Sequence, residues 1–148
     1  MKTIRKKRGF TLIEMLVVIA IIAVLVSVAL PVVAKSTTKA KAATDAANMR
    51  SVYAIANAIL YGDSPEAAEA DLETRHFPCK SFPDAKLELV FDYPAFVEVY
   101  FVDGDNYYSR DYFAEVIQEG ESSVSTAAPD IQGAQWYVVG EGSEIPTA

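Results

Sequence analysis

A single carboxylate, Glu14, near the start of a strongly apolar stretch, is the first residue whose type and position point to chemistry. Between Phe10 and Ala34 only Thr11, Glu14 and Ser27 are polar. A carboxylate buried among apolar groups is tolerated only if it is paired. Glu14 is therefore a candidate for an ion pair that forms when this stretch is packed against apolar neighbours.

The rest of the chain offers few groups for catalysis or metal binding. His76 and Cys79 are the only histidine and the only cysteine, and two ligands do not make a zinc site. The acidic stretch 103–106 suggests calcium, but an EF-hand loop would need glycine and glutamate where the chain has Tyr108 and Ala114. We predict no metal, no cofactor and no catalytic residue. The alternative of an enzyme or ligand-binding domain on a membrane tether lacks a convergent polar cluster.

Charge is unevenly distributed along the chain, whose formal net charge is −7. Five basic residues precede the apolar stretch: Lys2, Arg5, Lys6, Lys7 and Arg8. From Leu87 onward twelve acids face one base, Arg110. Binding to phosphates requires clustered lysine and arginine, so nucleic acid is disfavoured as a partner of the second half.

The apolar stretch is long enough to cross a membrane. The 25 residues from Phe10 to Ala34 would form a helix of roughly 37 Å, at about 1.5 Å per residue. A hydrocarbon core is about 30 Å thick. The preceding basic cluster predicts that residues 1–9 lie in the cytoplasm and that the C-terminus lies outside. We expect a single-pass protein of the cytoplasmic membrane.

Two other interpretations of this segment remain. A secretory signal peptide is one, because Val32 and Ala34 satisfy the small-residue cleavage rule and Lys35 follows. However, the apolar run exceeds the usual 7 to about 15 residues of a signal peptide, and a signal peptide has no use for an acid at its cytoplasmic end. The other is an ordinary uncleaved anchor in which Glu14 is incidental.

The sequence GFTLIE at residues 9–14, with a basic leader before it and an apolar helix after it, resembles the class III signal of type IV pilins and pseudopilins. The resemblance covers roughly residues 5–34 and does not extend to the rest of the chain. It implies that a membrane-embedded prepilin peptidase cuts between Gly9 and Phe10. It also implies that the new amino group of Phe10 is methylated.

The same resemblance implies roles for Glu14 and Pro31. Glu14 becomes the fifth residue of the mature chain, and the amino group of Phe10, on the same or the next chain, is its available partner. Because an unpaired buried charge is penalised, this pair can guide assembly by setting the stagger between subunits. Pro31 lies where many type IV pilins have a proline that loosens the helix in the fibre. The alternative for Pro31 is a simple kink near the outer interface.

The helix is predicted to continue beyond Ala34 as an amphipathic segment, 35–61, ended by Gly62. Its apolar face has three- and four-residue spacing and should pack on a sheet. That face consists of Met49, Val52, Tyr53, Ala56, Ile59 and Leu60. Ser64 and Pro65 predict the start of a short helix over 65–74, and a loop follows at 76–85.

From Lys86 the pattern changes to a period of two, which predicts strands. Alternating apolar residues are Leu87, Leu89, Phe91, Val97, Val99 and Phe101. Asp103 and Gly104 indicate a turn, 106–113 is predicted as the return strand, and 136–140 as the last strand after a polar loop. The tyrosines at 100, 107, 108 and 112 are predicted to lie on sheet faces. The predicted class is α+β, a long helix packed on an antiparallel sheet of three to four strands, which is also the pilin fold.

These observations predict four regions and one function. The regions are a cleaved leader (1–9), a transmembrane and filament-core helix (10–34), its amphipathic continuation (35–61) and a soluble head (62–148). The predicted function is that of a type IV pilin, a structural subunit in a surface filament for adhesion, motility or DNA uptake. The apolar stretch predicts membrane lipid as a partner before assembly. The resemblance implies the other partners, which are related pilin subunits, prepilin peptidase and the inner-membrane assembly platform with its cytoplasmic ATPase.

The alternative is a pseudopilin of a type II secretion or competence apparatus. Many type IV pilins close a C-terminal loop with a disulfide, and the lone Cys79 departs from that pattern. The departure is compatible with a pilin of a single-membrane bacterium, a minor pilin or a pseudopilin. The sequence therefore separates these classes poorly.

Overall fold

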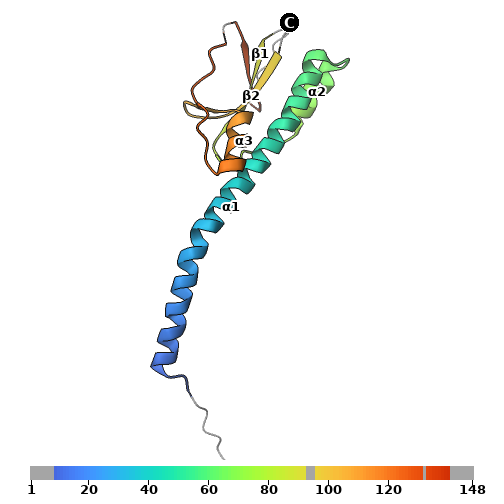
Figure 1. The fold of residues 1–148 in the computed structure, drawn as a ribbon. Coiled ribbons are helices and arrows are strands. Elements are labelled where there is room, and N and C mark those ends of the chain that lie inside the picture. Colours follow the sequence, from blue (N-terminus) through green and yellow to red (C-terminus); the bar gives the residue numbers. More distant parts are fainter. Residues whose placement is uncertain (1–8, 93–95, 132, 141–148) are drawn as a thin grey trace, which may run out of the picture. The chain divides into compact units, whose positions relative to one another are not determined.

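The computed structural model describes residues 9–92, 96–131 and 133–140 (Figure 1). The predicted leader, apart from Gly9, lies outside the described residues, and so does the end of the predicted head at 141–148. The chain divides into two compact units, Met1–Ser36 and Thr37–Ala148, and each is described by itself. Helix α1, Leu12–Tyr61, contributes residues to both.

In the first unit, α1 exposes its apolar side chains all round. The large hydrophobic side chains of this part range from 45% exposed at Val26 to 83% at Leu12. An 18-residue window of α1 has a mean hydropathy of 3.2, and none of it is buried. This part of the helix is thus long and apolar enough to cross a membrane.

In the second unit, one face of α1 is buried against the head. The buried apolar side chains repeat at three- and four-residue intervals, as a helix face requires, and they are Ala42, Ala46, Met49, Val52, Ile55, Ala56 and Ile59. Tyr53 and Leu60 are partly buried beside them. The predicted apolar face is confirmed, and the alanines extend it toward the start of the unit.

The sheet that receives this face has four antiparallel strands in the order β3-β2-β1-β4. Their bounds are β1 Lys86–Asp92, β2 Phe96–Asp103, β3 Asn106–Tyr108 and β4 Gln135–Val138. In the register, Leu89 lies opposite both Val99 and Tyr137, and all three are fully buried. The period of two is therefore confirmed as one core-facing side of the sheet.

Helix α2, Pro65–Thr74, has the predicted bounds. Ser64 stands at its N-cap position, but its side chain makes no capping hydrogen bond. Leu72 is fully buried, and the hydroxyl of Tyr137 on β4 donates to Glu73. These contacts tie α2 to the edge of the sheet at β4.

The predicted return strand over 106–113 is wrong in its second half. Strand β3 ends at Tyr108, and helix α3, Arg110–Glu119, follows at once. The Ser109 hydroxyl accepts a hydrogen bond from the Tyr112 N–H at 3.4 Å, which caps the first turn. Tyr112 therefore lies on a helix and not on a sheet face.

Glycine and helical spacing explain why α3 forms. Gly120 has φ of 93° and donates its N–H to the Val116 carbonyl at 2.8 Å, a left-handed helix end that glycine adopts without strain. Phe113 and Val116 are three residues apart and buried on one face. The run of aromatic residues before Phe113 favoured a strand locally, but the Ser109 cap and Gly120 outweigh that preference.

The polar segment after α3 is held along the edge of the sheet. The Glu115 carboxylate accepts hydrogen bonds from the Ser122 hydroxyl (2.7 Å) and from the N–H (2.9 Å) and hydroxyl (2.9 Å) of Ser123. Further along, the Thr126 carbonyl accepts the N–H of Tyr107 on β3 at 2.9 Å. This segment, residues 121–127, occupies part of an edge that would otherwise be open to pairing with another chain.

Candidate processing and assembly site

Gly9 and Phe10, the predicted cleavage residues, are both exposed. Phe10 is 79% exposed, and among the described residues a Cβ added at Gly9 would meet nothing within 4 Å. The described part of the fold therefore does not require a glycine at position 9. A requirement for glycine there would have to come from a protein that recognises the segment.

Thr11 and Glu14 form a capping box at the start of α1. The backbone N–H and the hydroxyl of Thr11 each donate to Oε2 of Glu14 at 2.7 Å. In return, the Glu14 N–H donates to the Thr11 hydroxyl at 3.3 Å. The acid thus satisfies donors that the helix itself leaves without a partner.

This role of Glu14 was not predicted, although its signal was present. Thr11 and Glu14 have the spacing of a Ser/Thr-x-x-Glu capping box. The prediction concentrated instead on the amino group that cleavage would create at Phe10. In the uncleaved chain the structure brings Glu14 to Thr11, and the pairing with Phe10 stays a prediction.

Pro31 lies inside α1, which continues on both sides of it. Proline has no N–H to donate to the carbonyl four residues earlier, here that of Ser27. The Ser27 hydroxyl donates to the Val24 carbonyl at 2.7 Å, within the same turns of helix. This stretch therefore has a weaker hydrogen-bond ladder than its surroundings, and the role of Pro31 in a fibre stays a prediction.

In the second unit, Asp45 is the only buried charged or polar residue among those described. It is fully buried, and its two carboxylate oxygens accept the N–H groups of Lys80 (2.5 Å) and Ser81 (2.8 Å). One turn along the helix, the Asn48 side chain donates to the Pro78 carbonyl at 2.9 Å. Together Asp45 and Asn48 hold the loop before β1 on α1.

Two further polar side chains of α1 reach other segments of the head. The ammonium group of Lys39 donates to the carbonyl of Gln118 near the end of α3, where a positive charge is favourable. The hydroxyl of Tyr53 accepts the N–H of Val99 on β2 at 3.2 Å. Neither Lys39 nor Asp45 was predicted from the sequence to contact the head; the signal for Asp45 is an acid in the middle of an apolar helix face.

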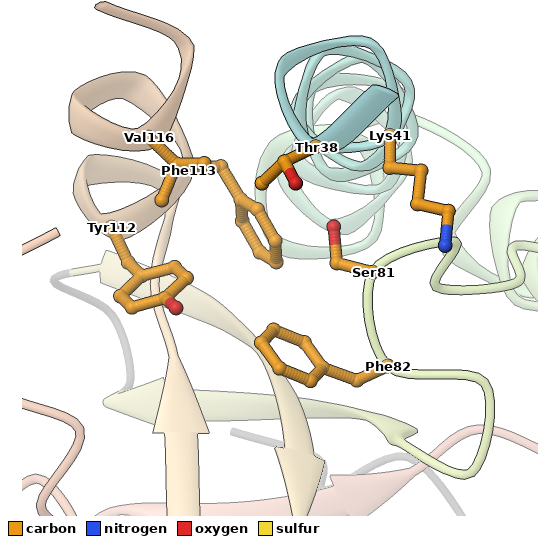
Figure 2. Close-up of a pocket in the computed structure, with 7 residues that line it drawn as sticks. All are labelled: Thr38, Lys41, Ser81, Phe82, Tyr112, Phe113 and Val116. Carbon is orange, nitrogen blue, oxygen red and sulfur yellow. The ribbon is translucent and has the colours of Figure 1, made fainter. Parts of the chain in front are cut away.

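A cavity of about 180 Å³ lies between α1, the loop before β1 and α3 (Figure 2). Phe82, Tyr112, Phe113 and Val116 form its apolar wall, and Thr38, Lys41 and Ser81 bring polar groups to its rim. The wall belongs to an aromatic cluster in which Phe82 stacks on Tyr108 with ring centroids 3.8 Å apart. The cavity therefore has a mainly aromatic wall and one cationic side chain at its rim.

Cys79 is buried, 4% exposed, and its sulfur accepts the Phe82 N–H at 3.4 Å. Burial raises the pKa of the Cys79 thiol to about 12, so the thiol is protonated and unreactive at neutral pH. Cys79 and His76 line one cavity of about 230 Å³. Within the described residues no group of three or more His, Cys, Asp or Glu side chains is placed to hold a metal ion.

The turn at 103–106 is closed by its own hydrogen bonds. Gly104 has φ of 60°, a conformation suited to glycine in a hairpin turn. The Asn106 side chain donates to the Asp103 carbonyl at 3.4 Å and its oxygen accepts the Thr126 hydroxyl at 3.0 Å. The Asn106 amide thus closes the turn and links it to the segment 121–127.

The described residues thus include an exposed apolar helix segment with a capped acid near its start and, in the second unit, a head held on α1 by buried polar contacts. Residues 4–30 match the model of the prokaryotic N-terminal methylation motif. Comparisons with curated proteins and with solved structures found no match. Over residues 4–30 the chain therefore carries the N-terminal methylation motif that is characteristic of type IV pilins and pseudopilins.

Proposed function

We propose that this protein is a type IV pilin, made as a membrane-anchored precursor, cleaved between Gly9 and Phe10 and polymerised into a surface filament. The observation that carries the proposal is the methylation motif at residues 4–30, together with the first part of α1, Leu12 to Val33, whose large apolar side chains are all exposed. Such a surface has to be covered, first by lipid and then by the same helix of other subunits. A helix that is apolar on every side suits both environments.

The cleavage step supplies the partner that Glu14 needs inside a filament. In the uncleaved chain the carboxylate is satisfied by Thr11 at 2.7 Å. Cutting after Gly9 creates a positive amino group at Phe10, next to that cap. When the helix then packs among others, a subunit placed out of register leaves the acid unpaired, which is strongly unfavourable in an apolar surrounding.

A pseudopilin of a type II secretion or competence apparatus is the second candidate, because the motif is common to both classes. The lone, buried Cys79 departs from the C-terminal disulfide of many type IV pilins and is compatible with this candidate, as it is with a minor pilin or a pilin of a single-membrane bacterium. In either case the proposed partners are prepilin peptidase, related subunits and an assembly platform driven by a cytoplasmic ATPase. The proposed orientation has the head outside the cytoplasmic membrane.

Two measurements on the native host test these proposals. Mass spectrometry of the purified protein should find an N-terminus at methylated Phe10, and an N-terminus at Met1 or at Lys35 would contradict the assignment. Shearing intact cells should release the protein in filaments. Recovery from the cell envelope alone would favour the pseudopilin.

A further inference from the structure

The second unit carries an exposed aromatic side chain at the C-terminal end of α1 and, near the start of its own part of that helix, a cavity large enough for an aromatic ring. Tyr61, the last residue of α1, is 62% exposed, more than any other large hydrophobic side chain described in this unit. The cavity between α1, the loop before β1 and α3 has a volume of about 180 Å³. A cavity of roughly 150 Å³ holds one benzene ring, so this one is large enough for a phenol ring.

The chemistry of the cavity suits a tyrosine. Phe82, Tyr112 and Phe113 present rings to it, while the hydroxyls of Thr38 and Ser81 lie at its rim (Figure 2). Aromatic rings gain from edge-to-face and offset contacts with one another. A buried tyrosine also needs a hydrogen-bond partner for its hydroxyl, and the rim hydroxyls can provide one.

The charges beside the two features are complementary. Across residues 51–74 the chain has five acids and no lysine or arginine, and Asp63 and Glu66 follow Tyr61 closely. At the cavity's end of the unit, by contrast, residues 37–41 have two lysines and no acid. Lys39 is engaged with the end of α3, whereas Lys41 is exposed and extends beside the cavity (Figure 2).

We propose that Tyr61 of one copy of this protein inserts into the cavity lined by Phe82 and Tyr112 of a second copy, with Lys41 of the second copy facing the acids that follow Tyr61. Lys41 and Tyr61 are 20 residues apart on α1, which is about 30 Å at roughly 1.5 Å per residue. One copy therefore cannot fill its own cavity. A contact between two different surfaces repeats from copy to copy and builds an open fibre unless it closes into a ring. The inference deepens the proposed filament and rests on it.

Gly62 keeps Tyr61 at the end of the helix. Its N–H donates to the Ala58 carbonyl at 2.9 Å, and a Cβ at this position would lie 2.2 Å from the same carbonyl oxygen. Any other residue at position 62 would shift the backbone at this end of α1. A side chain at position 62 would therefore disturb the turn that follows Tyr61.

A photo-crosslinking experiment on filaments tests the contact. Tyr61 is replaced by p-benzoylphenylalanine in the full chain, co-expressed with the unmodified protein, and sheared filaments are irradiated and digested. We expect crosslinks to peptides containing Ser81 and Phe82 or Tyr112 to Val116 of another copy. The matched control carries the same probe at Trp136, which is 39% exposed, and should not reach these peptides.

Charge exchange provides the second readout. Lys41→Glu should reduce filament yield about tenfold, and Arg50→Glu, the same change on an exposed residue of the same helix, should leave it near normal. Adding Asp63→Lys to Lys41→Glu should restore much of the loss. Filaments that crosslink elsewhere, or a double variant no better than Lys41→Glu, would overturn the contact and leave the proposed function standing. No filaments from the unmodified chain would overturn both.

Discussion

The Thr11 backbone N–H and the Glu14 carboxylate are 2.7 Å apart in the uncleaved chain, so the acid at the start of α1 already has a local partner. The same carboxylate oxygen also accepts the Thr11 hydroxyl. The proposed cut between Gly9 and Phe10 would leave this cap in place, because Thr11 and Glu14 both lie after the cut. Glu14 is thus a helix cap in the precursor, and the proposed pairing with the Phe10 amino group becomes possible only after cleavage.

Replacing the acid should separate these two roles. Glu14→Val is expected to leave membrane insertion and cleavage after Gly9 intact and to block or severely slow incorporation into filaments. Thr11→Val, which removes the capping hydroxyl and retains the acid, should still assemble. The measurement is the amount of mature protein in sheared filaments relative to membranes. Normal filaments from Glu14→Val would refute the pairing with Phe10.

Gly9→Val should accumulate as an uncut precursor in the membrane. The described structure leaves open space around Gly9, so the substitution is not expected to disturb the fold. Its effect should therefore come from recognition by the peptidase. Intact-mass analysis of the membrane fraction measures the retained leader, and mature fibres from this variant would show that the cleavage site is misplaced.

Asp45→Ala should destabilise the head. The substitution removes both acceptors of the Lys80 and Ser81 N–H groups and leaves space in a fully buried position. We expect a loss of roughly 2–3 kcal/mol in the free energy of unfolding, measured by urea titration of the full chain in detergent. The control is Asp84→Ala, at an exposed acid of the same loop, which should change the free energy of unfolding little. Equal stability of the two variants would argue against the anchoring role of Asp45.

Glu115 should make the segment 121–127 sensitive to acid. Hydrogen bonds from the Ser122 hydroxyl, then from the Ser123 N–H and hydroxyl, lower the pKa of Glu115. Because the folded-state pKa is lower, the stabilisation is complete above the unfolded value of about 4.3 and is lost as pH falls through the folded-state pKa. Glu115→Gln removes the same negative charge at neutral pH. Near pH 7, the amide of Ser123 should therefore exchange its hydrogen faster in Glu115→Gln than in the unmodified chain, and unchanged protection would contradict the contact.

The Cys79 thiol should be inert in the folded protein. Its pKa of about 12 leaves almost no thiolate at pH 8, and burial limits access. An aromatic disulfide reagent is expected to react with it only after urea is added. A cysteine introduced by Ala127→Cys, at an exposed position, should react at once in the same sample. Rapid native reaction of Cys79 would mean that the loop before β1 opens readily.

Much of the fold could be predicted because its signals are local. The length of the apolar stretch, the helical spacing from Met49 to Ile59 and the alternation from Leu87 to Phe101 each involve neighbours a few residues apart. Pro65 and Gly62 mark helix ends through their own backbone chemistry. Likewise, the motif around Gly9 is a contiguous segment, which is why the resemblance to pilins could be seen without a structure.

Other features were decided only when distant segments met. Residues 110–113 became helix and not strand because, besides the local Ser109 cap and the Gly120 helix end, Phe113 on this helix packs in the core with the distant Phe101. Asp45 is tolerated in an apolar face because its two carboxylate oxygens accept the N–H groups of Lys80 and Ser81. These donors lie 35 and 36 positions further along the chain. The energy of a buried charge depends on the groups that surround it in space. Sequence spacing alone does not show which distant residues those groups belong to.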